Sequence, residues 1–153
     1  MRKISFYIGL LTILIISSSA TQESCDVRAL KNELIRELRP DFKYDSSNIN
    51  RFIFEDKEQG TEVQVPIFSN ESYRLLFNTA AIPTDFEIKI YNKKFGANNR
   101  KLLFSVKGGE SDKHIFVFEP EEAKTMYIDY MLPAVTEKDI TGCIVFLMGY
   151  KIG

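Results

Sequence analysis

The chain has no tryptophan, one histidine and two cysteines among its 153 residues. Two cysteines are too few for a miniprotein held by several disulfides or for a zinc site of four cysteines, and one histidine does not complete a mixed ligand set. His114 is the only side chain whose ordinary pKa lies near neutral pH, so general-base catalysis has few candidates. The sequence therefore predicts no metal site and leaves little room for enzymatic chemistry.

An excess of charge of one sign is also lacking, since the formal net charge is -1 at pH 7. Without a positive excess the chain has no general electrostatic attraction for nucleic acid, and no nucleic-acid partner is expected. Phosphate-binding loops, dinucleotide-binding motifs and zinc-protease motifs are absent, so no cofactor is expected either. Hydrophobic residues make up 44% of the chain, which is too many for a disordered protein and suits one globular domain.

Long hydrophobic runs are limited to one, at the N-terminus. Arg2 and Lys3 precede a mostly apolar stretch at 4–16, and Ser18 and Ala20 stand where signal peptidase requires small residues. The stretch is about 13 residues long, short of the roughly 20 that span a bilayer. We therefore expect residues 1–20 to be a signal peptide and the mature chain to have no transmembrane segment. A buried N-terminal helix and an uncleaved anchor are the alternatives.

The mature chain is expected to begin at Thr21 and to be exported to the periplasm or the extracellular space. Removal of two basic residues leaves 18 basic against 21 acidic side chains, so the mature protein is mildly acidic. In an oxidising compartment, Cys25 and Cys143 are expected to form a disulfide that ties the N-terminal segment to the last strand. The alternatives are two free buried thiols, or acylation of Cys25 as in a lipoprotein, which would prevent the pairing.

An amphipathic helix is predicted at about 26–38. Val27, Leu30, Leu34 and Leu38 recur at spacings of three and four, and the opposite face carries charges of both signs. Pro40 ends the helix, because the residue before a proline is disfavoured in the helical conformation. Mixed charges favour packing on a core over binding to a membrane surface.

After Tyr44 the hydrophobic pattern changes to a period of two, and turn-forming residues separate short runs. The expected strands are Asn50–Phe54, Glu62–Phe68, Tyr73–Asn78, Phe86–Tyr91, Leu102–Val106, His114–Phe118, Met126–Leu132 and Cys143–Tyr150. Eight short strands without intervening helices predict a mainly β fold. We expect an eight-stranded antiparallel β-sandwich, jelly-roll-like, with one N-terminal helix, in a single domain over 21–153.

The composition of each run predicts its place in the sheets. Pro66 cannot donate to a ladder, so its strand should be an edge strand or carry a bulge. The runs His114–Phe118 and Cys143–Leu147 are apolar on both faces and should lie in mid-sheet or under the helix. Asp129 interrupts an apolar run and is expected to face water on the polar side of its strand.

The loop Asn92–Lys101 is the one positively charged feature of this mildly acidic chain. Such a loop can contact an anionic glycan, a lipid headgroup or an acidic protein, and exposed loops on a rigid sandwich often carry recognition. An ordinary soluble hairpin loop is the alternative. The candidate binding residues are Tyr91, Lys93, Lys94, Phe95, Arg100 and Lys101.

Catalytic candidates are weaker. Glu119, Glu121 and Glu122 could supply paired carboxylates or calcium ligands, although a solvated turn explains them as well. Ser111, Asp112 and His114 are too close together on one loop to reach the geometry of a catalytic triad. No catalytic residue is therefore assigned.

Two segments resemble a known family. Tyr73–Phe77 (YRLLF) and Asp85–Tyr91 (DFEIKIY) are similar to consecutive strands of the pre-peptidase C-terminal domains, small β-sandwich modules of secreted bacterial proteases. The resemblance extends over Glu62–Met148 and implies a β-sandwich without an active site. The whole chain also resembles small exported β-sandwich proteins of unknown function from Bacteroidetes-type bacteria.

These observations lead to one hypothesis and one alternative. The hypothesis is an exported, non-enzymatic β-sandwich protein with a binding or structural role at the cell envelope, whose partner is an envelope protein or a glycan. The alternative is a small carboxylate-dependent hydrolase acting outside the cytoplasm, which would need a cleft with two facing acidic side chains.

Overall fold

The computed structural model describes residues 25–68, 71–109, 112–122 and 124–152. The predicted signal peptide and the expected start of the mature chain at Thr21 lie outside these residues, as does Ser111. The elements in chain order are α1 (Val27–Leu38), β1 (Lys43–Ile53), β2 (Gln59–Val65), β3 (Glu71–Ala81), β4 (Glu87–Tyr91), β5 (Leu102–Lys107), β6 (Ile115–Phe118), β7 (Met126–Leu132) and β8 (Thr141–Ile152).

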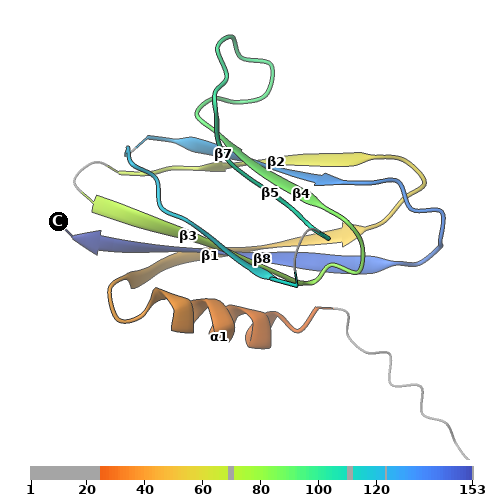
Figure 1. Ribbon diagram of the computed structural model, residues 1–153, viewed down its shortest axis with the longest axis horizontal. Coiled ribbons are helices and arrows are strands. Elements are labelled where there is room, and N and C mark those ends of the chain that lie inside the picture. Colours follow the sequence, from red (N-terminus) through yellow and green to blue (C-terminus); the bar gives the residue numbers. More distant parts are fainter. Residues whose placement is uncertain (1–24, 69–70, 110–111, 123, 153) are drawn as a thin grey trace, which may run out of the picture.

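The strands form two four-stranded antiparallel sheets that face each other (Figure 1). The first sheet has the order β1-β8-β3-β6 and the second has the order β2-β7-β4-β5. Strand β1 pairs with β8, β2 with β7, β3 with β6 and β4 with β5. The chain is therefore one long hairpin that folds over itself, which is the jelly-roll arrangement, and the loop between β4 and β5 is the tip of that hairpin.

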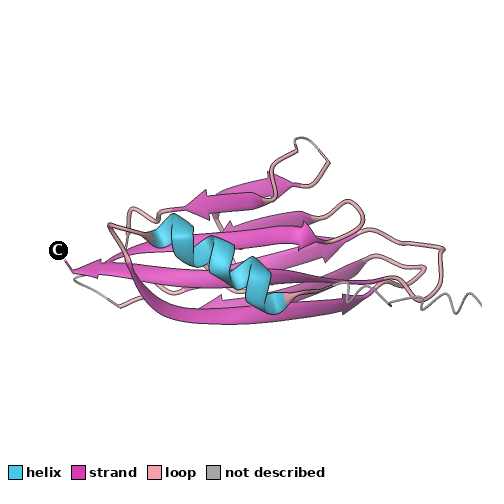
Figure 2. Cartoon of the chain, turned by 90° about the horizontal axis from the view of Figure 1, so that it is seen from below, coloured by secondary structure: helices cyan, strands magenta, loops and turns pink. Residues whose placement is uncertain are grey.

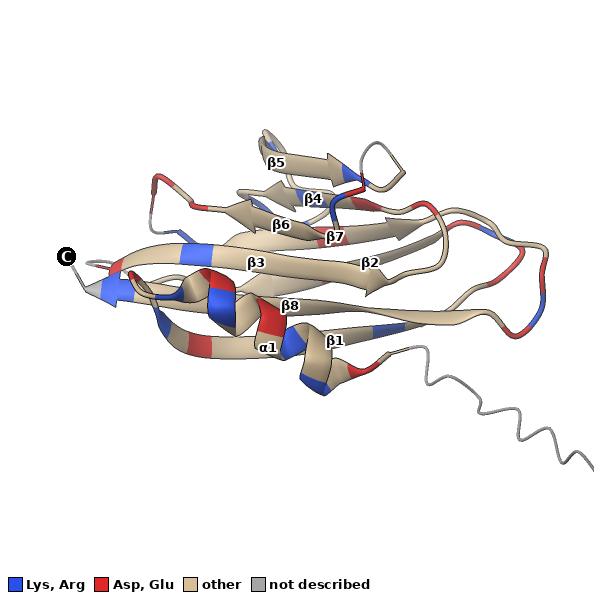
Figure 3. Ribbon diagram, turned by 60° about the horizontal axis from the view of Figure 1, so that its bottom comes forward, with Lys and Arg blue, Asp and Glu red and all other residues tan. Residues whose placement is uncertain are grey.

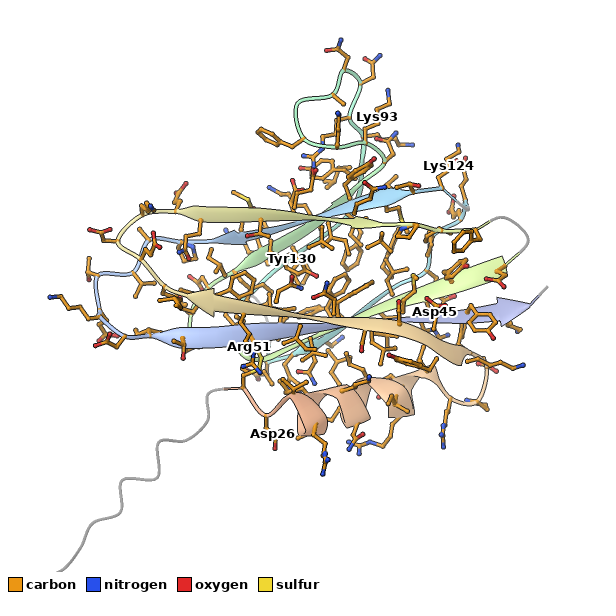
Figure 4. The ribbon with its side chains drawn as sticks, turned by 180° about the vertical axis from the view of Figure 1, so that it is seen from behind. Asp26, Asp45, Arg51, Lys93, Lys124 and Tyr130 are labelled. Carbon is orange, nitrogen blue, oxygen red and sulfur yellow. A yellow bond between two sulfur atoms is a disulfide. The ribbon has the colours of Figure 1, made fainter. Side chains whose placement is uncertain are left out.

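The main core fills the space between the sheets with large side chains. Phe77 and Tyr130 are essentially fully buried and come from opposite sheets, with their ring centroids 6.4 Å apart. The ring centroids of Phe146 and Phe77, which both belong to the first sheet, are 5.3 Å apart. Figure 4 places Tyr130 between the two sheets. Ile88 and Ile90 point inward while Glu87, Lys89 and Tyr91 point outward, as their alternation predicts.

Helix α1 covers the outer face of the first sheet (Figure 2). Asp26 caps its N-terminus by accepting a hydrogen bond from the Ala29 amide at 3.0 Å. Its buried residues Leu30, Leu34 and Leu38 form a second core with sheet residues such as Leu76, Val145 and Leu147. Figure 3 shows acidic and basic residues mixed along the helix, in keeping with a structural role.

A polar contact also fixes the helix to the sheet. Asn78 of β3 is fully buried, and its Nδ2 donates to the Leu30 carbonyl at 3.3 Å and to Glu33 Oε2 at 2.7 Å. Its Oδ1 accepts a hydrogen bond from the Ala80 amide at 3.1 Å. A buried amide is tolerated here because both of its ends have partners.

The disulfide between Cys25 and Cys143 is confirmed, with Cα atoms 5.7 Å apart. It joins the residue before the cap of α1 to β8, and both cysteines are buried in the core beneath the helix. The two alternatives, free thiols and an acylated Cys25, do not fit this paired state.

Three expectations about strand position have different outcomes. Pro66 directly follows β2, which is an edge strand as predicted. Residues Cys143–Leu147 belong to β8, which lies in mid-sheet under the helix. The prediction that His114–Phe118 lies in mid-sheet is wrong, because β6 is an edge strand. Of this run, only the partly buried Ile115 packs against the core beneath the helix. The apolar run arises because Phe116 and Phe118 instead pack against the main core.

Candidate functional site

The loop Asn92–Lys101 projects from the outer face of the second sheet, away from α1 (Figure 1). Figure 4 shows Lys93 on this projection. Two of its residues have left-handed backbone conformations, Gly96 with φ 76° and Asn99 with φ 56°. Glycine and asparagine are the residues that adopt this conformation most readily, so the loop sequence suits its tight path.

Arg100 anchors the loop to the sheet below it. Its Nη2 contacts Glu62 Oε2 and Asp129 Oδ1, each at 2.8 Å, and its Nε donates to the Lys93 carbonyl at 2.8 Å. Glu62 and Asp129 are directly opposite each other on β2 and β7. Two like charges at such a cross-strand position repel, so a guanidinium between them stabilises both the sheet and the loop.

This ion cluster is largely shielded from water. The Arg100 side chain is 15% exposed and that of Asp129 is 13% exposed. The hydrogen bond to Asp129 and the two nearby carboxylates raise the pKa of Arg100, outweighing the opposing effect of burial. The expectation that Asp129 faces water is therefore wrong. It points to the outer face of its strand, but Arg100 covers it, which a strand pattern alone does not reveal.

Aromatic rings complete the anchor. The Arg100 guanidinium carbon lies 3.6 Å from the centroid of the Tyr91 ring and 5.7 Å from that of Phe95. The Phe95 amide donates to Glu62 Oε2 at 2.7 Å, so the same carboxylate holds both the arginine and the loop backbone. The stacking adds a favourable cation–π interaction to the ion pairs.

Most other polar groups of the loop are also satisfied within it. Lys93 Nζ donates to the Asn98 carbonyl at 2.9 Å, and the Lys101 amide donates to Asn92 Oδ1 at 2.7 Å. What faces outward is the Phe95 ring, with the residue 78% exposed, and the neighbouring Lys94. The loop is thus a well-braced projection that presents an apolar ring beside a positive charge.

The structure brings the six predicted residues together but divides them into two groups. Tyr91 and Arg100 stack on each other, are partly buried and hold the loop on the outer face of the sheet, whereas Lys93, Lys94, Phe95 and Lys101 are exposed. Glu62 and Asp129 belong to the site and were missed. Asp129 could have been noticed as an acidic residue inside the apolar run of β7. Its partner could not, because the contact with Arg100 depends on strand pairing that the sequence does not specify.

A groove of about 330 Å³ lies beside the base of the loop. One wall comes from the loop and the start of β5, and the other comes from the turn after β6 and the start of β7. The apolar part includes Leu102, Leu103, Phe118 and Met126, and the polar rim consists of Asn92, Lys101, Glu119, Glu121, Glu122, Lys124 and Thr125.

The acidic residues of this groove all come from one turn and are mostly paired with cations. Glu119 Oε1 contacts Arg74 Nη2 at 2.6 Å, and Glu122 forms an ion pair with Lys124. The hydrogen bond from Lys124 lowers the pKa of Glu122, and the charges of Lys124 and Lys101 act in the same direction. A general acid requires the opposite shift.

The geometry of the described residues adds little support for the remaining catalytic and metal-binding candidates. His114 is exposed, and its carbonyl accepts hydrogen bonds from the Thr79 amide and hydroxyl at 2.9 and 3.2 Å. Within the described part of the chain, no three His, Cys, Asp or Glu side chains gather closely enough to hold a metal ion.

Within the same residues no helix has both the length and the apolar character needed to cross a bilayer. Comparisons with protein-family models, with curated proteins and with solved structures give no significant match. The resemblance to pre-peptidase C-terminal domains therefore stays a prediction, and the functional argument depends on the fold and on the geometry of the loop.

Proposed function

We propose that the chain is an exported, non-enzymatic β-sandwich protein that binds a partner at the cell envelope, with the loop Asn92–Lys101 as its recognition element. The observation that carries this proposal is the anchoring of Arg100, which fixes the loop backbone through Glu62, Asp129 and the Lys93 carbonyl. A braced loop loses little conformational entropy when it binds, so its exposed side chains can contribute their full interaction.

Export is supported by the disulfide and by the N-terminal pattern. A buried bridge between Cys25 and Cys143 persists in an oxidising compartment and is rare in the cytosol. The positively charged start and short apolar stretch of residues 1–20 fit a cleaved signal peptide.

The alternative of a carboxylate-dependent hydrolase has less support. Such an enzyme needs two acidic groups on opposite sides of its substrate. The acidic residues that line the groove of the loop base share one turn, while the facing wall contributes Asn92, Lys101, Leu102 and Leu103. A second hollow of about 440 Å³ at the end of α1 has no acidic residue in its lining, which consists of Ile35, Leu38, Arg39, Pro40, Phe42, Lys43 and Tyr44.

The proposal is tested by co-sedimentation of the mature, oxidised protein with envelopes isolated from the source organism. The triple variant Lys93→Ser/Lys94→Ser/Phe95→Ser removes the outward group and keeps Arg100 in place. We expect its bound fraction to fall at least tenfold, with a melting temperature close to that of the wild type. The three side chains are exposed, and their removal costs only the hydrogen bond from Lys93 to the Asn98 carbonyl and the longer of the two ring contacts of Arg100.

A matched control is the triple variant Phe68→Ser/Lys107→Ser/Lys138→Ser, which changes one exposed phenylalanine and two exposed lysines outside the loop. It should sediment like the wild type. If the bound fraction falls equally in both variants, binding depends on exposed charge and apolar surface anywhere on the molecule. The loop would then not be the recognition element.

A further inference from the structure

We propose that the partner of the exposed loop tip, Lys93–Gly96, is the surface of an anionic lipid bilayer. This inference rests on the proposed function, because it names the partner of the same loop. It is based on the side-chain groups of the loop that are exposed to solvent and are not used in contacts within the protein.

The first step is the accounting of polar groups in the loop. Asn92, Lys93 and Arg100 all have partners within the loop or the sheet, and the Phe95 amide is held by Glu62. Lys94 contributes its carbonyl to a turn with Ala97, while no other described residue bonds its ammonium. The tip, Lys93–Gly96, therefore offers few free hydrogen-bonding groups besides the Lys94 ammonium, and the exposed Asn98 and Asn99 lie in the loop beyond it.

The second step is the chemistry of what remains. A glycan is recognised by directed hydrogen bonds to its hydroxyl groups. The amide side chains that suit such bonds are outside the tip: Asn98 and Asn99 follow it in the loop, and the Oδ1 of Asn92 already accepts from the Lys101 amide. A phenyl ring has no polar atom, and Phe95 is the most exposed of the large hydrophobic side chains described. A bilayer interface accepts an apolar ring beneath its headgroups and attracts lysines through its phosphates, so it matches both neighbouring groups at once.

The third step is orientation. The mature chain carries 18 basic and 21 acidic side chains, so an anionic surface does not attract it as a whole. The loop projects from the outer face of the second sheet (Figure 1), and Lys93 and Lys94 are on its outside. Exposed lysines on a projection can reach an anionic surface before the acidic body of the protein does, so an anionic bilayer favours an approach with the loop first.

The expected affinity is modest and sensitive to salt. Each lysine near an anionic bilayer is worth about a fivefold change in partitioning, and full burial of a phenyl ring about tenfold or more. A single loop with these groups supports reversible adsorption to the bilayer. Its binding is weaker than that of a protein held by two lipid chains, or by one lipid chain and a basic patch.

The test uses the mature, oxidised protein and vesicles of pure lipid in low salt. One set contains equal parts of phosphatidylglycerol and phosphatidylcholine, and the other contains phosphatidylcholine alone. We expect binding to the anionic set only, a reduction of about tenfold for Phe95→Ser and of about 25-fold for Lys93→Ser/Lys94→Ser. Phe68→Ser and Lys107→Ser/Lys138→Ser serve as controls and should bind like the wild type.

The outcomes separate this inference from the proposed function. Absence of binding to anionic vesicles, or binding that the loop variants leave unchanged, overturns the lipid assignment. If isolated envelopes still bind through the loop in that case, the recognition role stands and the partner is an acidic protein or glycan. If neither envelopes nor vesicles depend on the loop, both proposals fail.

Discussion

At the scale of single residues, the four cations of the loop have unequal roles. Lys93, Lys94 and Lys101 are exposed, whereas Arg100 is enclosed by two carboxylates and a tyrosine ring. Replacing Arg100 would leave Glu62 and Asp129 facing each other without a cation, so a change in binding could come from loss of structure. The sequence predicts the loop and its charge, but strand register alone decides which cation is structural.

Tyr73 gives a prediction about alkaline pH. Its side chain is buried, and burial together with the hydrogen bond that its hydroxyl donates to Glu71 raises its pKa to about 12. In the unfolded chain the phenol has a pKa near 10, so between these values the unfolded state loses its proton first. The free energy of unfolding should therefore be unaffected by this group below pH ~10 and fall as pH rises toward 12, by about 2 kcal/mol.

Urea unfolding between about pH 9 and about pH 11.5 measures this effect. We expect Tyr73→Phe to lose less stability over that range than the wild type. Burial also raises the pKa of Tyr130, which contributes equally to both proteins. Tyr44, whose pKa is lowered by its hydrogen bond with Ser47, is the control, because Tyr44→Phe should not weaken the alkaline loss. Equal slopes for Tyr73→Phe and the wild type would contradict the prediction.

At the scale of elements, the seating of α1 depends on a glycine in β8. A Cβ at Gly149 would meet the Leu38 side chain and lie 2.9 Å from the Lys43 carbonyl oxygen. The carbonyl belongs to the backbone and cannot move aside as a side chain can. We expect Gly149→Ala to lower the free energy of unfolding by about 1–3 kcal/mol, as overpacking does in other cores.

Gly60→Ala provides the comparison for this substitution. Its Cβ would meet the Met131 sulfur at 3.2 Å, and a flexible thioether can shift. Thermal or urea unfolding should show a clearly smaller loss for Gly60→Ala than for Gly149→Ala. A smaller effect at Gly149 would mean that the helix moves away from the sheet at little cost.

All eight predicted strands and the helix are present, but their limits and order were not all predictable. Strand β1 begins at Lys43, seven residues before the expected run at Asn50. Its first half is polar and mostly exposed, so no hydrophobic alternation marks it. It is a strand because it pairs with the apolar strand β8 from the far end of the chain. Such pairing is a tertiary effect, and it also decides that β6 lies at an edge.

At the scale of the whole molecule, export and the disulfide lead to one joint prediction. Protein recovered outside the cytoplasm should begin at Thr21, and its intact mass should be lower than the reduced value by two hydrogen atoms. Replacing both cysteines by alanine should reduce the free energy of unfolding by up to about 4–5 kcal/mol, because the bridge closes a loop of 118 residues. N-terminal sequencing, mass spectrometry and urea unfolding check the three parts.

Each of these measurements can contradict a different part of the prediction. A full-length chain embedded in the membrane would refute cleavage, and an added acyl mass on Cys25 would point to a lipoprotein instead. Free thiols in protein purified under oxidising conditions would contradict the bridge.

The same bridge determines how the molecule carries mechanical tension. Cys25 precedes every described strand, and Cys143 lies near the start of the last one. When the chain is pulled from segments on either side of this pair, β8 beyond Cys143 can peel from its neighbours, and the load then passes through the sulfur atoms. The 118-residue separation corresponds to roughly 400 Å of extended chain that tension cannot draw out. The sandwich from β1 to β7, with its projecting loop, is thus mechanically bypassed as long as the bridge is intact.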